Sequence, residues 1–137
     1  MKKQNYDEGI KKRKKVLGTK YVNKAIKNKN LFNEDFQNFI TINCWDKVWN
    51  NNYLSDKQKS FNTLCILAAT NKWDEFQLHL EGSLNNGCNL SELKELFLQI
   101  TLYCGVPTGN ECFKKASELF KYKKININKS LKSKIKK

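Results

Sequence analysis

The feature that most constrains this chain is the spacing of its apolar residues, which recur every three or four positions through the middle of the sequence. No segment shows the sustained two-residue alternation of a half-buried strand, and only one proline interrupts the chain. Two neighbouring segments carry such stripes, one of Phe61, Leu64, Cys65 and Ala68 and the other of Trp73, Phe76, Leu80 and Leu84. The pattern predicts an all-helical fold.

Local signals mark where these helices begin and end. Ser55 followed by Gln58, and Asn89 followed by Glu92, each fit a capping box at a helix N-terminus. Gly87 is a natural left-handed stop for the helix that carries the second stripe. The sequence therefore predicts one helix that begins just after Ser55 and another that begins just after Asn89.

The segment LSELKELFLQITLYC is predicted to be the core helix. Besides an apolar stripe at helical spacing, it has Leu96, Leu98 and Leu102 on further faces, so we expect it to be buried nearly all round. Gly105 then breaks the chain, and Pro107 restarts it as a favoured first-turn residue. Further apolar residues predict one or two short helices before this region and a final helix after it.

Positive charge is concentrated at the two ends of the chain. The net charge is +13, yet residues 1–30 hold eleven Lys or Arg against two acids, and residues 121–137 hold eight Lys and no acid. Between these ends, seven Lys face eleven Asp or Glu, so the middle is mildly acidic. Because Arg13 is the only arginine, the bias fits a lysine-rich composition better than a phosphate-binding surface built from guanidinium groups. We expect solvated ends and no nucleic-acid partner.

The length of 137 residues and the apolar fraction of 39% fit one domain with a real core. We predict a single helical domain over residues 1–122 and a flexible, lysine-rich tail over residues 123–137, which has little to bury. The basic N-terminus has no apolar stretch after it, and no apolar run approaches the roughly 18 residues that span a bilayer. A cytoplasmic protein with no membrane partner is expected.

The cysteines indicate neither a disulfide framework nor a metal site. Their number, five, is odd, and no two have the C-x-x-C spacing. Cys65, Cys104 and Cys112 lie in apolar patterns and are expected to be small buried residues. One histidine and scattered cysteines give no ligand cluster, and no glycine-rich phosphate loop is present. No metal or other cofactor is predicted.

His79, the only histidine, follows Glu75 by one helical turn in the segment DEFQLHLEGSLNNG. At 100° per residue, the histidine lies about 100° from the centre of the apolar stripe and the glutamate about 140° away. The pair is either an ordinary surface interaction or, if another helix or another subunit covers the histidine, a site that transfers protons. Spacing alone leaves both interpretations open.

Several segments resemble, in order and spacing, the carboxymuconolactone decarboxylase family. They are GIKKRKKVLGTKYV, CWDKVW, SDKQKSFNTLCILAATNKWDEFQLHLEGSLNNG, NLSELKELFLQITLYCGVP and NECF. The resemblance covers residues 9–120 and implies a compact bundle of about six helices, of the alkylhydroperoxidase D-like type. It also implies a homo-oligomer, a trimer or a hexamer, with active sites in clefts near the subunit contacts.

The same resemblance implies cofactor-free decarboxylation of 4-carboxymuconolactone or a related small carboxylic acid. Loss of carbon dioxide leaves a dienolate, which must be protonated on carbon. By resemblance, His79 is the acid and Glu75 orients it or relays its proton. The residues expected to hold or enclose the substrate are Lys57, Lys59, Arg13, Trp45 and Trp49. The two tryptophans fit core or interface packing equally well.

Other functions stay open beside this one. The wider superfamily includes peroxidases whose catalytic helix reads C-x-x-C-x-x-x-H. Aligned on His79, the thiol positions are Lys72 and Glu75, so peroxide reduction is not expected. Lys59 also stands where the family commonly has arginine, which replaces a bidentate fork by a point charge. The alternatives are a non-catalytic oligomer of the same fold, a peroxidase-related oxidoreductase and nucleic-acid association through the basic ends.

Overall fold

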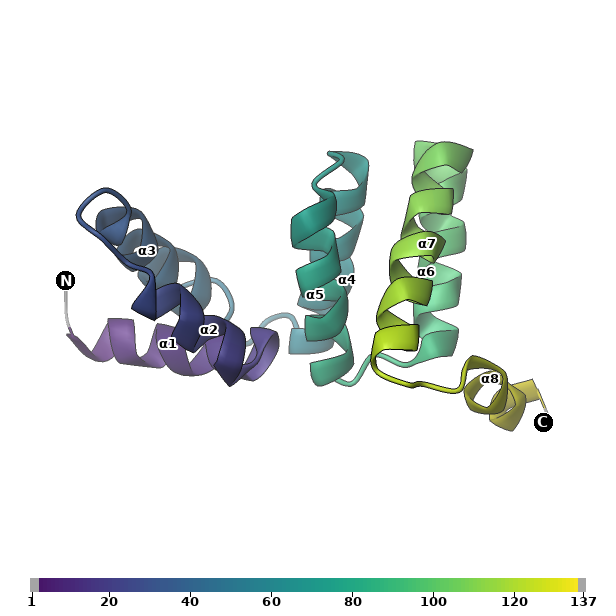
Figure 1. The fold of residues 1–137 in the computed structure, drawn as a ribbon, viewed down its shortest axis with the longest axis horizontal. Helices are drawn as coiled ribbons and strands as arrows, with labels where there is room; N and C mark the ends of the chain where they lie inside the picture. Colours follow the sequence, from purple (N-terminus) through teal and green to yellow (C-terminus); the bar gives the residue numbers. More distant parts are fainter. Residues whose placement is uncertain (1–2, 136–137) are drawn as a thin grey trace. The chain divides into compact units, whose positions relative to one another are not determined.

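The computed structural model describes the backbone of residues 3–135 and the side chains of residues 5–131. Within that part the chain forms eight α-helices and one π-helical segment, and no strand (Figure 1). The predicted all-helical fold is confirmed. The helices outnumber the six or so expected because both lysine-rich ends also contribute helices. None of the described helices combines the length and apolar character that crossing a bilayer requires.

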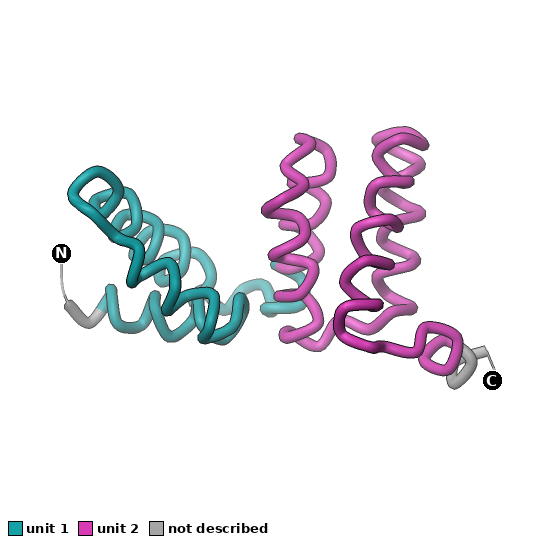
Figure 2. The backbone as a smooth tube through the Cα atoms, viewed as in Figure 1, with its two compact units in different colours: residues 1–59 teal, residues 60–137 magenta. Residues whose placement is uncertain are grey.

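The chain divides into two compact units, residues 1–59 and residues 60–137, each described here by itself (Figure 2). Unit 1 contains α1 (Lys3–Leu17), α2 (Thr19–Lys27), α3 (Glu34–Ile40), the π-helical segment η1 (Thr41–Asp46) and the first turn of α4 (Asp56–Ala69). Unit 2 contains the rest of α4, α5 (Trp73–Asn85), α6 (Leu90–Cys104), α7 (Val106–Tyr122) and α8 (Ile127–Ile135).

In unit 1, α1 packs against both α2 and η1. Gly9 lies at the closest approach, because a Cβ built on it would stand 2.1 Å from the carbonyl oxygen of Thr41. Val16 and Val22 are completely buried. The expectation of a solvated N-terminal end is therefore wrong. Its apolar positions occur at helical spacing, and the lysines between them occupy the other faces of the helices.

Helix α3 runs directly into η1, in the region where one or two short helices were predicted. In η1 the backbone hydrogen bonds skip one residue more than in an α-helix, for example from Lys47 N to Ile42 O (2.9 Å) and from Trp49 N to Cys44 O (3.0 Å). Trp45 and Trp49, four residues apart, lie on the same side of this stretch and stack on each other.

The predicted helix boundaries of α4, α5 and α6 are confirmed. Ser55 and Gln58 exchange the two hydrogen bonds of a capping box, at 3.1 and 2.8 Å. Asn89 and Glu92 do the same before α6. Helix α5 ends just before Gly87, which adopts a φ of 89°. Local hydrogen bonds thus set the ends of three consecutive helices.

The core of unit 2 lies between α4, α5, α6 and α7. Phe97 on α6 is its centre, with ring centroids 5.9 Å from Phe76 and 5.4 Å from Phe113. Helices α6 and α7 approach so closely that a Cβ on Gly109 would lie 1.8 Å from the hydroxyl oxygen of Thr101. This contact fixes how the two longest helices of the unit cross.

Helix α6 is not buried all round, contrary to the prediction. Leu98 exposes 55% of its surface and Leu102 exposes 77%. Only the face that carries Leu93, Phe97 and Ile100 is covered. The outer leucines belong to a face that no other described helix of unit 2 covers, so their apolar character does not indicate burial within one chain.

All five cysteines are free thiols. Cys44 in unit 1 and Cys104 in unit 2 are exposed, whereas Cys88 and Cys112 are buried. The expectation that Cys104 is buried is wrong, because this last residue of α6 lies on the uncovered side of the helix. Burial raises the pKa of Cys112 to about 12.

Part of the predicted tail is helical. Ile127 and Leu131 of α8 line a cavity together with α6 and α7. Flexibility of residues 123–137, and one domain over residues 1–122, stay predictions. The last two residues of the tail lie outside the described part of the chain.

Candidate active site

His79 lies in the middle of α5 and exposes only 9% of its surface. Proton transfer by this residue was predicted to need another helix or another subunit that covers the ring, and the ring is already covered within a single chain. Burial lowers the pKa of the imidazole from 6.5 to about 4, because a desolvated ring is harder to charge. At neutral pH the ring is uncharged, and a proton on it would be readily given up.

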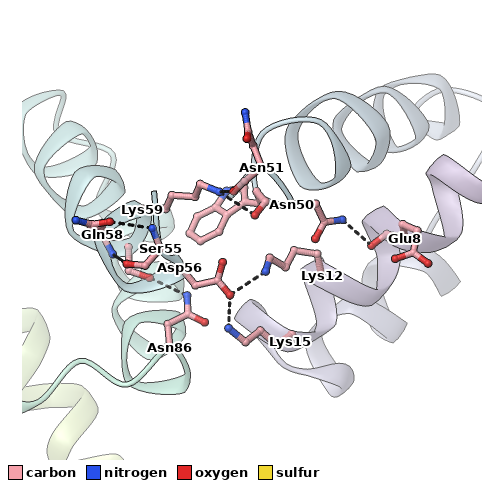
Figure 3. A network of polar contacts seen from close by, with 12 residues as sticks. Glu8, Lys12, Lys15, Asn50, Asn51, Ser55, Asp56, Gln58, Lys59 and Asn86 are labelled. Carbon is pink, nitrogen blue, oxygen red and sulfur yellow. Dashed lines mark hydrogen bonds and ion pairs between the residues drawn. The ribbon is translucent and has the colours of Figure 1, made fainter. Parts of the chain in front are cut away.

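Polar residues follow His79 along one face of α5 and into its C-terminal cap, and we call His79, Ser83 and Asn86 the α5 polar stripe. Ser83 is completely buried, and its hydroxyl donates to the carbonyl oxygen of Leu80 (2.6 Å). The Asn86 side chain donates to the hydroxyl of Ser60 on α4 (2.9 Å), and Figure 3 shows its position. Sequence reasoning missed this stripe, although the i, i+4, i+7 spacing from the histidine was visible.

Glu75, the predicted partner of His79, is exposed in the first turn of α5. The lowered pKa of the histidine has burial as its cause, whereas a nearby carboxylate would raise the pKa. The role of Glu75 in orienting the ring therefore stays a prediction.

Lys59 is engaged with the backbone of unit 1. It exposes 8% of its surface, and its ammonium donates to the carbonyl oxygens of Trp49 (3.0 Å) and Asn51 (Figure 3). Desolvation lowers the pKa of the ammonium. Lys57, two residues earlier in the same turn of α4, is half-buried. Both lysines were predicted to hold a substrate carboxylate, but the ammonium of Lys59 instead binds the backbone of unit 1.

Asp56, at the start of α4, binds two lysines of α1 in the same unit. Its Oδ2 accepts from Lys12 (2.8 Å) and from Lys15 (Figure 3). Burial works to raise the pKa of the carboxyl, but the two lysine hydrogen bonds outweigh it and lower the pKa. Sequence reasoning missed this cluster, because more than 40 residues separate the lysines from the aspartate.

Arg13 is a buried cation whose hydrogen bonding is incomplete. It exposes 4% of its surface, and its Nη1 donates to the side-chain oxygen of the neutral Gln37 (3.0 Å). Its Nε is buried and has no hydrogen-bond partner among the described residues. Buried guanidinium groups are normally paired with an acid or another acceptor, so this one is suited to receive an anion.

Trp45 and Trp49 stack on each other, with ring centroids 5.2 Å apart and planes at 24°. They expose only 4% and 5% of their surfaces. Such a pair is what core packing produces, and this alternative accounts for both residues. Their part in enclosing a substrate stays a prediction.

The predicted site residues fall into two sets. His79 and Glu75 belong to unit 2, whereas Arg13, Trp45, Trp49, Lys57 and Lys59 belong to unit 1. Among the residues that the structure describes, no group of three or more His, Cys, Asp and Glu is arranged to hold a metal ion. The chemistry that these side chains offer is proton transfer by a buried imidazole and anion binding by a buried guanidinium.

Comparisons with known proteins add a family and two relatives. Residues 34–118 match the model of the carboxymuconolactone decarboxylase family. The chain is 42% identical over 118 residues to a 4-carboxymuconolactone decarboxylase of Acinetobacter baylyi, covering 86% of this chain and 88% of the relative. It is 41% identical over 103 residues to a nitrosuccinic acid decarboxylase of Metarhizium robertsii, covering 75% of this chain and 72% of the relative.

Proposed function

The chain belongs to the carboxymuconolactone decarboxylase family, and we propose that it is a carboxy-lyase in which His79 delivers the proton that replaces the lost carboxyl group. The observation that carries the proposal is the burial of the only histidine, which makes its proton strongly acidic. Both relatives are named decarboxylases, which supports the reaction class.

The substrate is a small acid with more than one acidic or electron-withdrawing group, of the kind that the relatives' names describe. When such an acid loses carbon dioxide, the carbon–carbon bond breaks and its electron pair stays on the remaining carbon. A neighbouring carbonyl or nitro group must delocalise that pair, and a proton must then form the new C–H bond. The enzyme has to supply a positioned proton donor and shelter from water.

His79 can act as this donor only if it is protonated when substrate is bound. With a pKa of about 4 the free imidazole is neutral at pH 7. A substrate carboxylate beside the ring would raise that pKa, because opposite charges stabilise each other strongly in a desolvated site. We therefore propose that the substrate anion and one proton bind together. After the carboxylate leaves as neutral carbon dioxide, the imidazolium gives its proton to the carbanion.

Arg13 is the second residue of the proposal, as a group that binds a carboxylate. Its buried Nε has no partner among the described residues, so an incoming carboxylate finds a vacant donor. Lys59 fits this role less well, because its ammonium already binds two backbone carbonyl oxygens. Arg13→Lys keeps the charge but removes the fork, so it is expected to raise KM more than it lowers kcat.

Release of carbon dioxide from 4-carboxymuconolactone and from nitrosuccinic acid tests the reaction. The natural chain is expected to decarboxylate at least one of them, and His79→Gln to lose at least about a hundredfold in kcat. Asp74→Asn, an exposed change on the same helix, serves as the matched control and should keep full activity. Turnover of neither acid, or an unchanged rate in His79→Gln, contradicts the proposal.

Calorimetric titration with succinate, an unreactive dicarboxylate, tests the coupled binding of a proton. At pH 6 to 7, in buffers of different ionisation enthalpy, binding to the natural chain is expected to take up protons from the buffer. His79→Gln should bind without this uptake. Binding with no proton uptake by the natural chain would show that the histidine is not charged by its ligand.

Assembly into a trimer or hexamer is also part of the proposal. The uncovered face of α6, with Leu102 and Tyr103 exposed by 77% and 79%, supports it, because large apolar side chains are costly to leave in water. Light scattering coupled to gel filtration measures the mass of the particle. Leu102→Glu is expected to shift it toward the monomer, and a monomeric natural chain contradicts this part.

A further inference from the structure

Helices α6, α7 and α8 of unit 2 line a cavity of about 160 Å³ that is partly open to solvent and has no part in the proposed decarboxylation. Eight of its ten lining residues are apolar. Phe97 lies at its α6 wall, Phe113 and Phe120 lie at its α7 wall, and Ile127 and Leu131 form its α8 wall. Figure 1 shows α8 beside the ends of α6 and α7.

The size and lining of this cavity suit one small apolar group. Protein interiors are close-packed, so voids of this size are few. An apolar protein cavity of about 150 Å³, lined by leucine, isoleucine and phenylalanine, stays free of water and admits a benzene-sized molecule. Aromatic side chains on two walls offer edges and faces to a ring. Water would find almost no hydrogen-bond partner there.

One cation stands at the edge of this apolar space. Lys94 follows Leu90 by one turn of α6, lines the cavity and has an exposed side chain. It forms no ion pair among the described residues, and it is the only charged residue that lines the cavity. Ser117 on α7 adds a hydroxyl to the lining. A ligand with a ring inside and a carboxylate at the edge would satisfy both parts of this site.

We infer that this cavity binds a small monocarboxylic acid, whose ring or short branched chain fills the apolar space and whose carboxylate pairs with Lys94. The position of α8 gives the ligand a route. Only its two apolar residues Ile127 and Leu131 line the cavity on that side, which is partly open, and the first exposes 37% of its surface. A ligand can enter through this partly open side, and once bound it packs against α8 and holds the helix in place.

The test uses the whole 137-residue chain and three probes. Phenylacetate has both a ring and a carboxylate, toluene has the ring alone, and acetate has the carboxylate alone. Methyl resonances of Leu131 and Ile127 in NMR spectra report binding at this site. Phenylacetate is expected to saturate them, toluene to bind more weakly, and acetate to leave them unchanged. Absence of saturable shifts with phenylacetate overturns the inference.

Two variants separate the charge from the apolar space. Lys94→Gln is expected to weaken phenylacetate binding by about fivefold and to leave toluene binding as it was. Lys114→Gln, an exposed lysine of α7 outside the lining, is the control and should change neither. Equal phenylacetate affinity in the natural chain, Lys94→Gln and Lys114→Gln refutes the pairing of the carboxylate with Lys94. Ala116→Leu fills the cavity and should abolish binding of both ligands.

Because Ala116→Leu adds bulk to a packed region, Leu131→Phe on α8 provides a second filling variant in which α6 and α7 are untouched. Circular dichroism establishes that each variant is folded. Hydrogen exchange of the α8 amides is a further readout, since phenylacetate is expected to slow it in the natural chain and not in a folded, filled variant. Equal slowing in a filled variant would place the ligand elsewhere and refute the site.

Discussion

Lowering the pH from 7 to 5 is expected to destabilise the folded chain through His79. Burial holds the pKa of this imidazole at about 4, against 6.5 in an unfolded chain. Between these two values the unfolded state binds a proton that the folded state does not, so the free energy of unfolding falls as the pH falls. This one group accounts for a loss of about 2 kcal/mol between pH 7 and pH 5. The loss levels off at about 3 kcal/mol well below pH 4, where both states are protonated.

Urea unfolding followed by circular dichroism at pH 7 and pH 5 measures this loss. The comparison is with His79→Gln, which keeps a polar side chain but cannot take up the proton. Carboxyl groups titrate in both chains, so the difference between the two pH effects isolates the imidazole. Two chains with the same pH sensitivity would show that burial does not penalise the charged ring.

A direct measurement of the ring supports or refutes the same reasoning. Because the chain contains a single histidine, its imidazole gives one unambiguous NMR signal to follow with pH. In the folded chain the signal is expected to titrate near pH 4. A midpoint near 6.5 would mean a solvated ring, and the proton-coupled binding proposed for the substrate would lose its physical basis.

Three further changes test contacts that hold the fold. Lys59→Met should lower the free energy of unfolding by about 2 kcal/mol, because two backbone carbonyl oxygens lose a charged donor. The control Lys57→Met should lower it less, and an equal loss in both variants, measured by urea unfolding, would contradict this role of Lys59. Gly109→Ala should cost about 2 kcal/mol, and adding Thr101→Ala should recover part of it, whereas no recovery would remove their contact as the cause. Asn89→Ala should cost about 1 kcal/mol through the lost capping box, and an unchanged melting temperature would contradict this.

Sequence patterns were informative wherever the deciding interaction is local. The capping pairs Ser55–Gln58 and Asn89–Glu92 each span three residues, so their residue types alone indicate where α4 and α6 begin. The end of α5 at Gly87 is also a local feature, because a positive φ depends on one residue and favours glycine there. Helical periodicity likewise identifies the core face of α6 around Phe97.

Patterns failed where the deciding contact is distant in the chain. Nothing near Lys59 or Asp56 indicates that the first binds backbone carbonyls eight and ten residues upstream or that the second meets two lysines of α1. The buried face of α1 was hidden because its polar member, Arg13, looks like one more charge in a basic run. Leu102 shows the reverse error, because an apolar residue signals burial only if something covers it.

The burial of His79 lies between these cases. Its angle on α5 correctly placed it beside the apolar stripe, but the angle could not say whether a wall stood over it. The Ser60–Asn86 hydrogen bond, which ties α4 to the end of α5, is one of the contacts that only the folded unit reveals. The spacing of residues was enough to select His79 as a candidate site residue. How far its pKa is lowered depends on tertiary structure, which the spacing does not reveal.

The distribution of thiols equips this chain with its own set of covalent probes. In a single, unassembled chain an alkylating reagent reaches Cys44 and Cys104 without any rearrangement, and one of these lies in each unit. Cys112 is modified only when its part of the core opens, so its rate of labelling measures how often that event occurs. Mass spectrometry of a partly labelled sample would thus compare the labelling rate of the buried Cys112 with that of the exposed cysteines in one experiment. No cysteine has to be introduced by mutation.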